Sequence, residues 1–153
     1  LLENPVYLDK ICASMASHFS PDEVDIILGA AIGGILLSGG VGRHLNKRHI
    51  FTERVDGKME LRRGFSIQPH QRVLIVEDIV TTGSSVFEMI EVVKNNNADC
   101  VSVVCLVDRN KQGVDFGVRK DALLSLPSTD WDPEACPLCQ EGMSITIRGR
   151  SGK

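Results

Sequence analysis

Hydrophobic and polar positions follow two different periods along this chain. Between residues 5 and 19 the hydrophobic side chains recur at mostly helical spacing, and Pro5 is acceptable in a first turn, so we expect a helix there. Three aliphatic runs, at 24–28, 72–77 and 100–109, are nearly continuous instead. Strands with that pattern are covered on both faces, as in a parallel sheet. The alternation of strands and helices therefore predicts an α/β fold, with a mostly parallel central sheet and helices on both faces.

The segment between the first two aliphatic runs predicts three further elements. A turn of small residues at 29–34 leads into a segment up to residue 45 that must be helical despite three interior glycines. Each of these costs a helix about 1 kcal/mol relative to alanine, so we expect close contact between this helix and the sheet. A strand is expected around 49–52. It is followed by a charged, hairpin-like loop over 53–67 that turns at Asp56-Gly57.

The C-terminal half predicts one strong helix and several weaker elements. Residues 84–97 place hydrophobic side chains on one helical face, and Ser85 with Glu88 predicts a capping box at its start. After residue 111 the pattern weakens, and the candidate edge strands are short pieces. They lie at 116–119, 122–126 and 145–148. No repeat or low-complexity segment divides the chain, so we expect a single domain over residues 1–153.

Composition narrows the class of protein and of partner. The 153 residues carry a net charge of -3, with 42% hydrophobic and 24% charged residues, which argues against disorder and against a basic nucleic-acid surface. No hydrophobic run approaches the roughly 20 residues that cross a membrane. Five cysteines, an odd number, do not resemble a secreted disulfide framework. We therefore expect a cytoplasmic protein with a small-molecule partner, and neither a nucleic-acid nor a membrane partner.

The polar stretch that ends the central strand carries the candidate chemistry. The sequence VLIVEDIVTTGSS at 73–85 places two acids and then several hydroxyls at the carboxyl end of a strand, where open α/β sheets bind ligands. A TTGSS segment that leads into a helix offers backbone N–H groups, hydroxyls and the positive end of a helix dipole, which together suit a phosphate. Gly83 allows the backbone to approach that phosphate closely.

The two acids, Glu77 and Asp78, would repel a phosphate that they touched, so they must face another group. A sugar diol fits, because a carboxylate can accept hydrogen bonds from two adjacent hydroxyls. No lysine stands where a triphosphate-cleaving P-loop needs one. The alternative, in which the hydroxyls only cap a helix and the acids only end a strand, explains single residues but not the ordered set. The stretch therefore predicts a ribose 5-phosphate site.

The same stretch resembles the phosphoribosyl-diphosphate (PRPP) signature of type I phosphoribosyltransferases, the orotate branch in particular. The resemblance covers nearly all of the chain. GAAIGGILL at 29–37 resembles the family's diphosphate loop, and FTERVDGKMELRRGF at 51–65 resembles its flexible catalytic loop, here about 53–66. VDFGV at 114–118 and DPEACPLCQEG at 132–142 resemble the tail of one orotate subgroup. The resemblance implies transfer of the 5-phosphoribosyl group from PRPP to orotate, giving orotidine 5'-monophosphate and diphosphate in pyrimidine synthesis.

Carried over residue by residue, the resemblance assigns contacts to each substrate. Glu77 and Asp78 would hold the ribose hydroxyls, and Arg109 would pair with the orotate carboxylate, for which a planar guanidinium is the best partner. Thr81 would contact both the 5-phosphate and orotate. 6-Oxopurine transferases commonly carry an aspartate at that position, which argues against a hypoxanthine or guanine substrate. The other implied contacts are Ile79, Val80, Thr82, Gly83, Ser84 and Ser85 for PRPP, and Ala30, Ala31, Ile32 and Gly33 for the diphosphate.

The charged loop is expected to supply a catalytic cation. Arg54 and Lys58 match the family residues that reach the diphosphate, often across a homodimer interface, and Lys58 and Asp78 are the predicted catalytic residues. Negative charge builds on the leaving diphosphate, so a lysine that arrives late stabilises the transition state more than the ground state. Mg²⁺ would share that task, held by PRPP oxygens and water more than by protein ligands. Residues 59–64 contain no histidine, unlike better-known loops of the family, so the proton-transfer role stays unassigned.

Two features leave alternatives open. Cys136 and Cys139 form one CxxC, which is two ligands short of a usual zinc site, so local packing of the tail 132–153 is favoured over metal or redox use. The chain begins at Leu1 without the base-covering hood that the family places before the first helix, which suggests that N-terminal sequence is missing. The alternatives to the orotate reaction are a non-catalytic PRPP-binding regulator and a phosphoribosyltransferase for another base.

Overall fold

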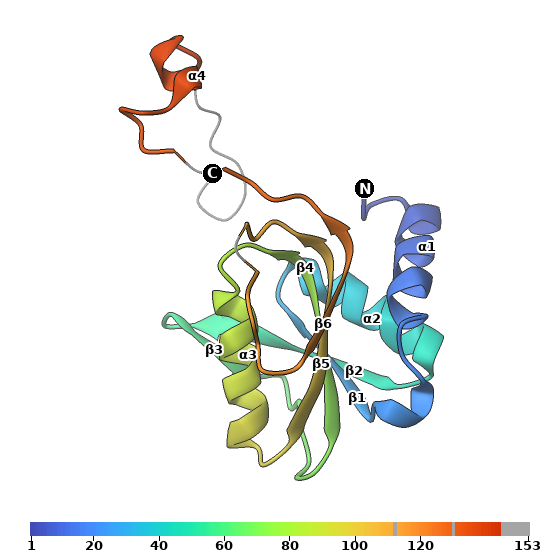
Figure 1. Ribbon diagram of the computed structural model, residues 1–153. Helices are drawn as coiled ribbons and strands as arrows, with labels where there is room; N and C mark the ends of the chain where they lie inside the picture. The colour runs from blue at the N-terminus through green and yellow to red at the C-terminus, as the bar shows by residue number, and fades with distance from the viewer. Residues whose placement is uncertain (112, 130, 145–153) are drawn as a thin grey trace.

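A six-stranded sheet runs through the middle of the part of the chain that this computed structural model describes, residues 1–111, 113–129 and 131–144 (Figure 1). The strand order is β3-β2-β1-β4-β5-β6. β1, β2, β4, β5 and β6 pair in parallel, and β3 is antiparallel to β2, so the predicted mostly parallel sheet is confirmed. In chain order the strands are β1 Ile26–Ala30, β2 Arg48–Val55, β3 Lys58–Leu61, β4 Arg72–Val80, β5 Asp99–Asp108 and β6 Arg119–Ser125.

Helices cover both faces of this sheet, as predicted (Figure 1). α1, Pro5–Ala16, and α2, Gly33–Leu45, pack on one face, and α3, Ser84–Asn95, packs on the other. A 3-10 turn at Pro21–Glu23 leads into β1, and the short α4, Pro137–Gln140, lies in the tail away from the sheet. The chain therefore forms three layers, with the sheet in the middle.

The central strands explain why their aliphatic runs do not alternate with polar residues. Successive side chains of a strand point to opposite faces. On β4, Val73 and Ile75 belong to the core beneath α3, whereas Leu74 and Val76 belong to the core beneath α1 and α2. Both faces are buried, so both sets must be hydrophobic.

Three elements are longer or more continuous than their patterns predict. β4 extends to Val80, three residues past the expected end at residue 77, so Asp78 lies within the strand as well as Glu77. β2 covers Arg48–Val55, where only 49–52 was expected, because pairing with β3 continues it into the hairpin. β6, Arg119–Ser125, is one strand where two pieces were predicted, because its parallel ladder with β5 bridges them. The predicted piece at 145–148 lies outside the described residues.

The start of α3 differs from the predicted capping box. Gly83 is the N-cap, with a φ of 79°, and no side chain caps the helix. Ser85 therefore falls inside the first turn and cannot act as the cap. Glu88 instead accepts two hydrogen bonds from Arg54 of β2, at 2.7 and 2.8 Å. The capping-box prediction was wrong because tertiary pairing engages the glutamate.

The glycines of α2 do allow close packing, although against two different partners. A Cβ on Gly40 would collide with Cys12 of α1, so this glycine serves helix-helix contact. A Cβ on Gly42 would lie 2.9 Å from the carbonyl oxygen of Lys47 and 3.2 Å from Cβ of His49, where the chain enters β2. The expected contact with the sheet is thus confirmed at Gly42, while Gly40 is explained by α1.

Candidate active site

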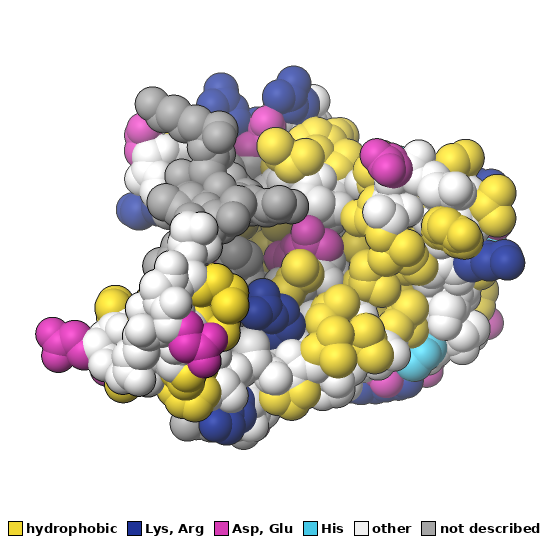
Figure 2. All heavy atoms as spheres, turned by 90° about the horizontal axis from the view of Figure 1, so that it is seen from above, with side chains coloured by type: hydrophobic (Ala, Val, Ile, Leu, Met, Phe, Trp, Pro, Cys, Tyr) yellow, Lys and Arg dark blue, Asp and Glu magenta, His cyan; other side chains and the backbone are white. Residues whose placement is uncertain are grey.

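The carboxyl edge of the sheet brings the predicted polar stretches together. β1, β4 and β5 run parallel and neighbour one another in the order β1-β4-β5, so their polar ends meet at one edge. Seen from above, acidic side chains lie in a hollow among hydrophobic ones, and a broad hydrophobic surface extends toward the α1 and α2 side (Figure 2). Two hollows of about 300 Å³ each open at this edge.

The first hollow, here called the acidic hollow, lies where β1 and β4 end. It combines the predicted diphosphate loop with the two predicted ribose-binding acids and one arginine from the hairpin. The peptide bond between Ala31 and Ile32 in that loop is cis. The residues that line it are Ala30, Ala31, Ile32, Gly33, Arg54, Met59, Glu77, Asp78, Ile79 and Ser85.

The two acids of this hollow have different environments. Successive strand residues point to opposite faces, and Glu77 is only 6% exposed, whereas Asp78 is half-buried. Burial, helped by a hydrogen bond and charge repulsion from Asp78, raises the pKa of Glu77 to about 8. Asp78 Oδ1 accepts the Ile79 N–H at 2.7 Å, and its other oxygen presses against Gly33. A side chain at Gly33 would displace that carboxylate.

The TTGSS segment, here called the hydroxyl loop and comprising Thr81–Ser85, connects β4 to α3. Thr81, Thr82 and Ser84 are exposed, and the Ser84 N–H lies 3.4 Å from Thr82 Oγ1. Gly83 has a φ of 79°, and a Cβ there would lie 2.8 Å from the Phe116 ring. Only glycine therefore suits this position on both counts. The loop presents hydroxyls and the first helix N–H groups at the positive end of a 12-residue helix.

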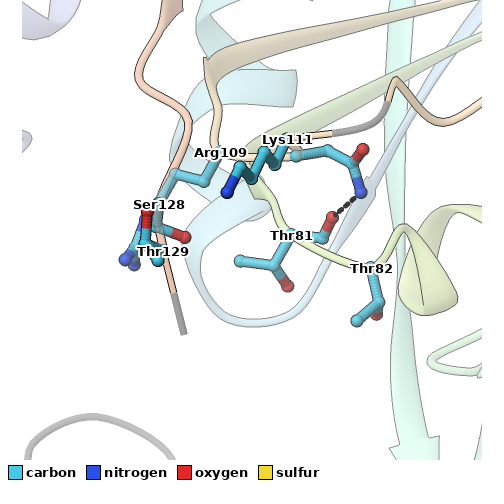
Figure 3. A pocket seen from close by; sticks show the side chains of 7 residues that line it. Thr81, Thr82, Arg109, Lys111, Ser128 and Thr129 are labelled. Atoms are coloured by element: carbon cyan, nitrogen blue, oxygen red, sulfur yellow. Dashed lines mark hydrogen bonds between the residues drawn. The ribbon is translucent and has the colours of Figure 1, made fainter. Parts of the chain in front are cut away.

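The second hollow, here called the cationic hollow, lies where β4, β5 and the segment after β6 meet (Figure 3). In Figure 3 the Arg109 side chain lies beside Ser128 and Thr129, and Thr81 lies across from them. Two cations and no carboxylate line this part of the described chain, so it suits an anion. Its residues are Thr81, Thr82, Arg109, Asn110, Lys111, Ser128 and Thr129.

Sequence reasoning missed four residues of the cationic hollow. Asn110 and Lys111 directly follow Arg109, so their position after the strand was a usable signal. Ser128 and Thr129 offered none, because they sit in a stretch without periodicity. They lie in the hollow because the pairing of β5 with β6 continues past the two strands. The Leu126 N–H donates to the Asp108 carbonyl at 2.8 Å, and the Ser128 N–H donates to the Arg109 carbonyl at 3.2 Å.

The charged loop forms the β2–β3 hairpin and turns where predicted. Asp56 and Gly57 have φ values of 46° and 85°, as a two-residue type I′ turn requires. Lys58 is exposed at the tip and belongs to the lining of neither hollow. Arg54 lines the acidic hollow, but Glu88 holds its guanidinium, and its Nε is buried without a hydrogen-bond partner in the described structure.

The CxxC lies on α4, apart from both hollows. Cys136 and Cys139 are unpaired and half-buried. Hydrogen bonding from the Cys139 backbone lowers the pKa of Cys136. Within 1–111, 113–129 and 131–144, no group of three or more His, Cys, Asp or Glu side chains could hold a metal ion. No helix described could cross a bilayer either: the longest, α2, has 13 residues.

Comparison with known proteins shows which family the chain belongs to. Residues 1–120 match the family model of the phosphoribosyl transferase domain. The chain is 48% identical to the orotate phosphoribosyltransferase of Desulforamulus reducens, over 97% of this chain and 78% of that protein. It is 43% identical to the orotate phosphoribosyltransferase of Thermotoga maritima, over 99% of this chain and 81% of that protein.

Solved structures show the same fold at lower identity. An adenine phosphoribosyltransferase from Rhodothermus marinus superposes with a TM-score of 0.71 at 19% identity, over 82% of each chain. An orotate phosphoribosyltransferase from Aeropyrum pernix superposes with a TM-score of 0.61 at 23% identity, over 79% of this chain and 71% of that one. By domain, by fold and by its similarity to curated relatives, the chain belongs to the orotate phosphoribosyltransferase family, within the type I phosphoribosyltransferases.

Proposed function

We propose that this chain transfers the 5-phosphoribosyl group from PRPP to orotate, giving orotidine 5'-monophosphate and diphosphate. One observation carries the proposal: the hydroxyl loop borders both hollows, through Ser85 on the acidic side and through Thr81 and Thr82 on the cationic side. A ribose 5-phosphate anchored on this loop has a site for its diphosphate on one side and a site for an anionic base on the other. That is the arrangement that a displacement at the anomeric carbon needs.

The acidic hollow supplies the contacts for ribose and diphosphate. Asp78 can accept hydrogen bonds from ribose hydroxyls, and Glu77 adds a second carboxyl group deeper in the hollow. The diphosphate would lie against the backbone N–H groups of Ile32 and Gly33, where the positive end of α2 begins, because the Ala31 N–H already donates to the Thr52 carbonyl at 2.8 Å. These groups stabilise the charge that develops on the leaving diphosphate.

Mg²⁺ fits this hollow as an ion that arrives with PRPP. It prefers oxygen ligands and keeps several waters, and the hollow offers two carboxyl groups but no set of three metal-binding side chains in the described chain. Glu77 and Asp78 would be the protein groups nearest to it. When bound, the ion neutralises charge on the diphosphate.

The cationic hollow supports orotate as the acceptor. Orotate carries a carboxylate, and Arg109 offers it a planar pair of donors while Lys111 adds a second cation nearby. Thr81 bridges this hollow and the hydroxyl loop, so it can contact base and phosphate alike. No carboxylate lines this hollow in the described part of the chain, so a base without one would bring no anion to the two cations.

Lys58 supports a homodimer, because it lies outside both hollows of its own chain. We propose that it reaches the diphosphate in a second copy. Mixing Lys58→Ala with Asp78→Asn subunits tests this, since a hybrid dimer would hold one site with both native residues. Recovery of about a quarter of the native turnover is expected for random mixing of a two-fold dimer. No recovery would contradict action between copies.

A cytoplasmic location accords with the five unpaired cysteines.

Orotate consumption, followed by ultraviolet absorbance with PRPP and Mg²⁺, tests the reaction itself. Turnover should need all three components and should fall at least about 100-fold in Lys58→Ala, as expected for loss of a charge that stabilises the transition state. Glu60→Ala, an exposed position on the same hairpin, is the matched control and should keep full turnover. PRPP binding without turnover of orotate would favour a regulator, and turnover of another base in preference to orotate would refute the assigned acceptor.

A further inference from the structure

A chain of hydrogen bonds links β6 to the hydroxyl loop across the end of β5. Lys120 Nζ donates to Asp108 Oδ2 at 2.6 Å, and Asp108 Oδ1 accepts the Asn110 backbone N–H at 2.9 Å. Asn110 Nδ2 then donates to the carbonyl oxygen of Thr81 at 2.7 Å, the dashed line in Figure 3. Three segments that are distant in sequence are thereby joined beside the cationic hollow.

Asp108 is the centre of this network, and it is 8% exposed. Burial opposes its ionisation, but the hydrogen bonds from Lys120 and from the Asn110 N–H outweigh burial and lower the pKa of the carboxyl. Both of its oxygens are thus engaged, one on each side. A buried ion pair is weak evidence for stability as such, whereas its directional hydrogen bonds fix one local geometry.

The network encloses the backbone of Arg109. The Arg109 N–H donates to the Val80 carbonyl at 2.8 Å, and its own carbonyl accepts from the Ser128 N–H at 3.2 Å. Asp108 and Asn110 close the turn on either side of it. Arg109 is itself exposed, so burial does not fix its guanidinium in place. The position of that guanidinium therefore depends on how firmly the backbone beneath it is held.

We propose that Asp108, Asn110 and Lys120 are positioning residues for base recognition. They hold Arg109 on one wall of the cationic hollow at a fixed separation from Thr81 on the other, so that one orotate can contact both walls. The inference rests on the proposed orotate reaction. It adds three residues that act through Arg109 and Thr81, and two of them, Asp108 and Lys120, do not line the hollow.

Asn110→Ala tests the bond between the two walls. Loss of the hydrogen bond to the Thr81 carbonyl should raise the KM for orotate about 3- to 10-fold. The KM for PRPP should change less than about twofold, because the serine end of the hydroxyl loop keeps its place at the start of α3. Asn95→Ala, at an exposed position at the opposite end of α3, is the control and should change neither value. An unchanged orotate KM, or equal increases in both KM values, would overturn the inference.

Variants at Lys120 distinguish a positioning role from a purely stabilising one. Lys120→Met should raise the orotate KM in the same way as Asn110→Ala, while Lys120→Arg keeps the cation and should restore it to within about twofold. A lower unfolding temperature in the Met variant with an unchanged orotate KM would show a purely structural role. If the unaltered chain consumes no orotate, the proposed function falls and this inference with it. If it does and Asn110→Ala keeps the parent KM, only this inference falls.

Discussion

The acidic and cationic hollows lie on the same sheet edge and have similar volumes, yet they are built in different ways. The acidic hollow consists mainly of two continuous stretches, the β1–α2 turn and the end of β4, with backbone groups, one buried carboxyl and one half-buried carboxyl. The cationic hollow consists mostly of exposed side chains, from three separate segments. Backbone placed by helix and strand is fixed by the fold, whereas exposed side chains need additional hydrogen bonds to hold them. The acidic hollow should therefore tolerate little change in shape, and the cationic hollow should respond to changes in individual contacts.

The largest effect is expected in the acidic hollow, from Gly33→Ala. The new Cβ would occupy the place of the Asp78 carboxylate and force it to rotate. Displacing a catalytic group by about 1 Å can cost about 100-fold, so kcat/KM should fall by at least about that factor. Gly39→Ala on the same helix is the control, since its Cβ would lie 3.3 Å from the edge of the His49 ring and should leave turnover intact. Equal losses in both variants would mean that the helix and not the carboxylate is affected.

The same contrast explains how much the sequence could predict. The parallel sheet, the covering helices and the 73–85 stretch follow from short-range patterns, because each uses consecutive residues with one period or one turn. The cationic hollow was predicted only at Thr81, Thr82 and Arg109. Ser128 and Thr129 depend on the pairing of β6 with β5, and no local periodicity marks that pairing. Glu88 illustrates the opposite error, in which a local motif predicts a contact that does not form. The sequence predicts a capping box there, but Glu88 instead forms an ion pair with Arg54, 34 residues away.

A second prediction concerns the buried acid of the acidic hollow and its dependence on pH. The pKa of Glu77 is about 8 in the folded chain, against an ordinary value of 4.5. Its neutral form is therefore favoured by folding, so its contribution to stability is complete below pH 4.5 and is lost as pH rises through 8. Glu77→Gln removes the titration. The variant should come close to the parent near pH 4.5 and exceed its unfolding free energy by about 5 kcal/mol near pH 9.

Urea unfolding at several pH values measures this difference. Glu60→Gln, at an exposed position, should show no such trend and is the control. A stability difference between Glu77→Gln and the parent that stays constant with pH would show that the carboxyl is already ionised in the folded chain. The two hollows would then not differ in having a neutral, buried ionisable group, and only the difference in how they are built would remain.

The smallest effect is expected in the cationic hollow, from Arg109→Lys. The charge remains, but an ammonium group cannot offer two parallel donors to a carboxylate, so the KM for orotate should rise about 10-fold while the KM for PRPP stays unchanged. Arg48→Lys at the amino end of β2 is the matched control. A rise in the PRPP KM would instead place Arg109 on the sugar phosphate, and the two hollows would then serve one substrate. A rise confined to orotate supports the division that the structure suggests, in which a fixed backbone site holds the donor and a set of positioned side chains selects the acceptor.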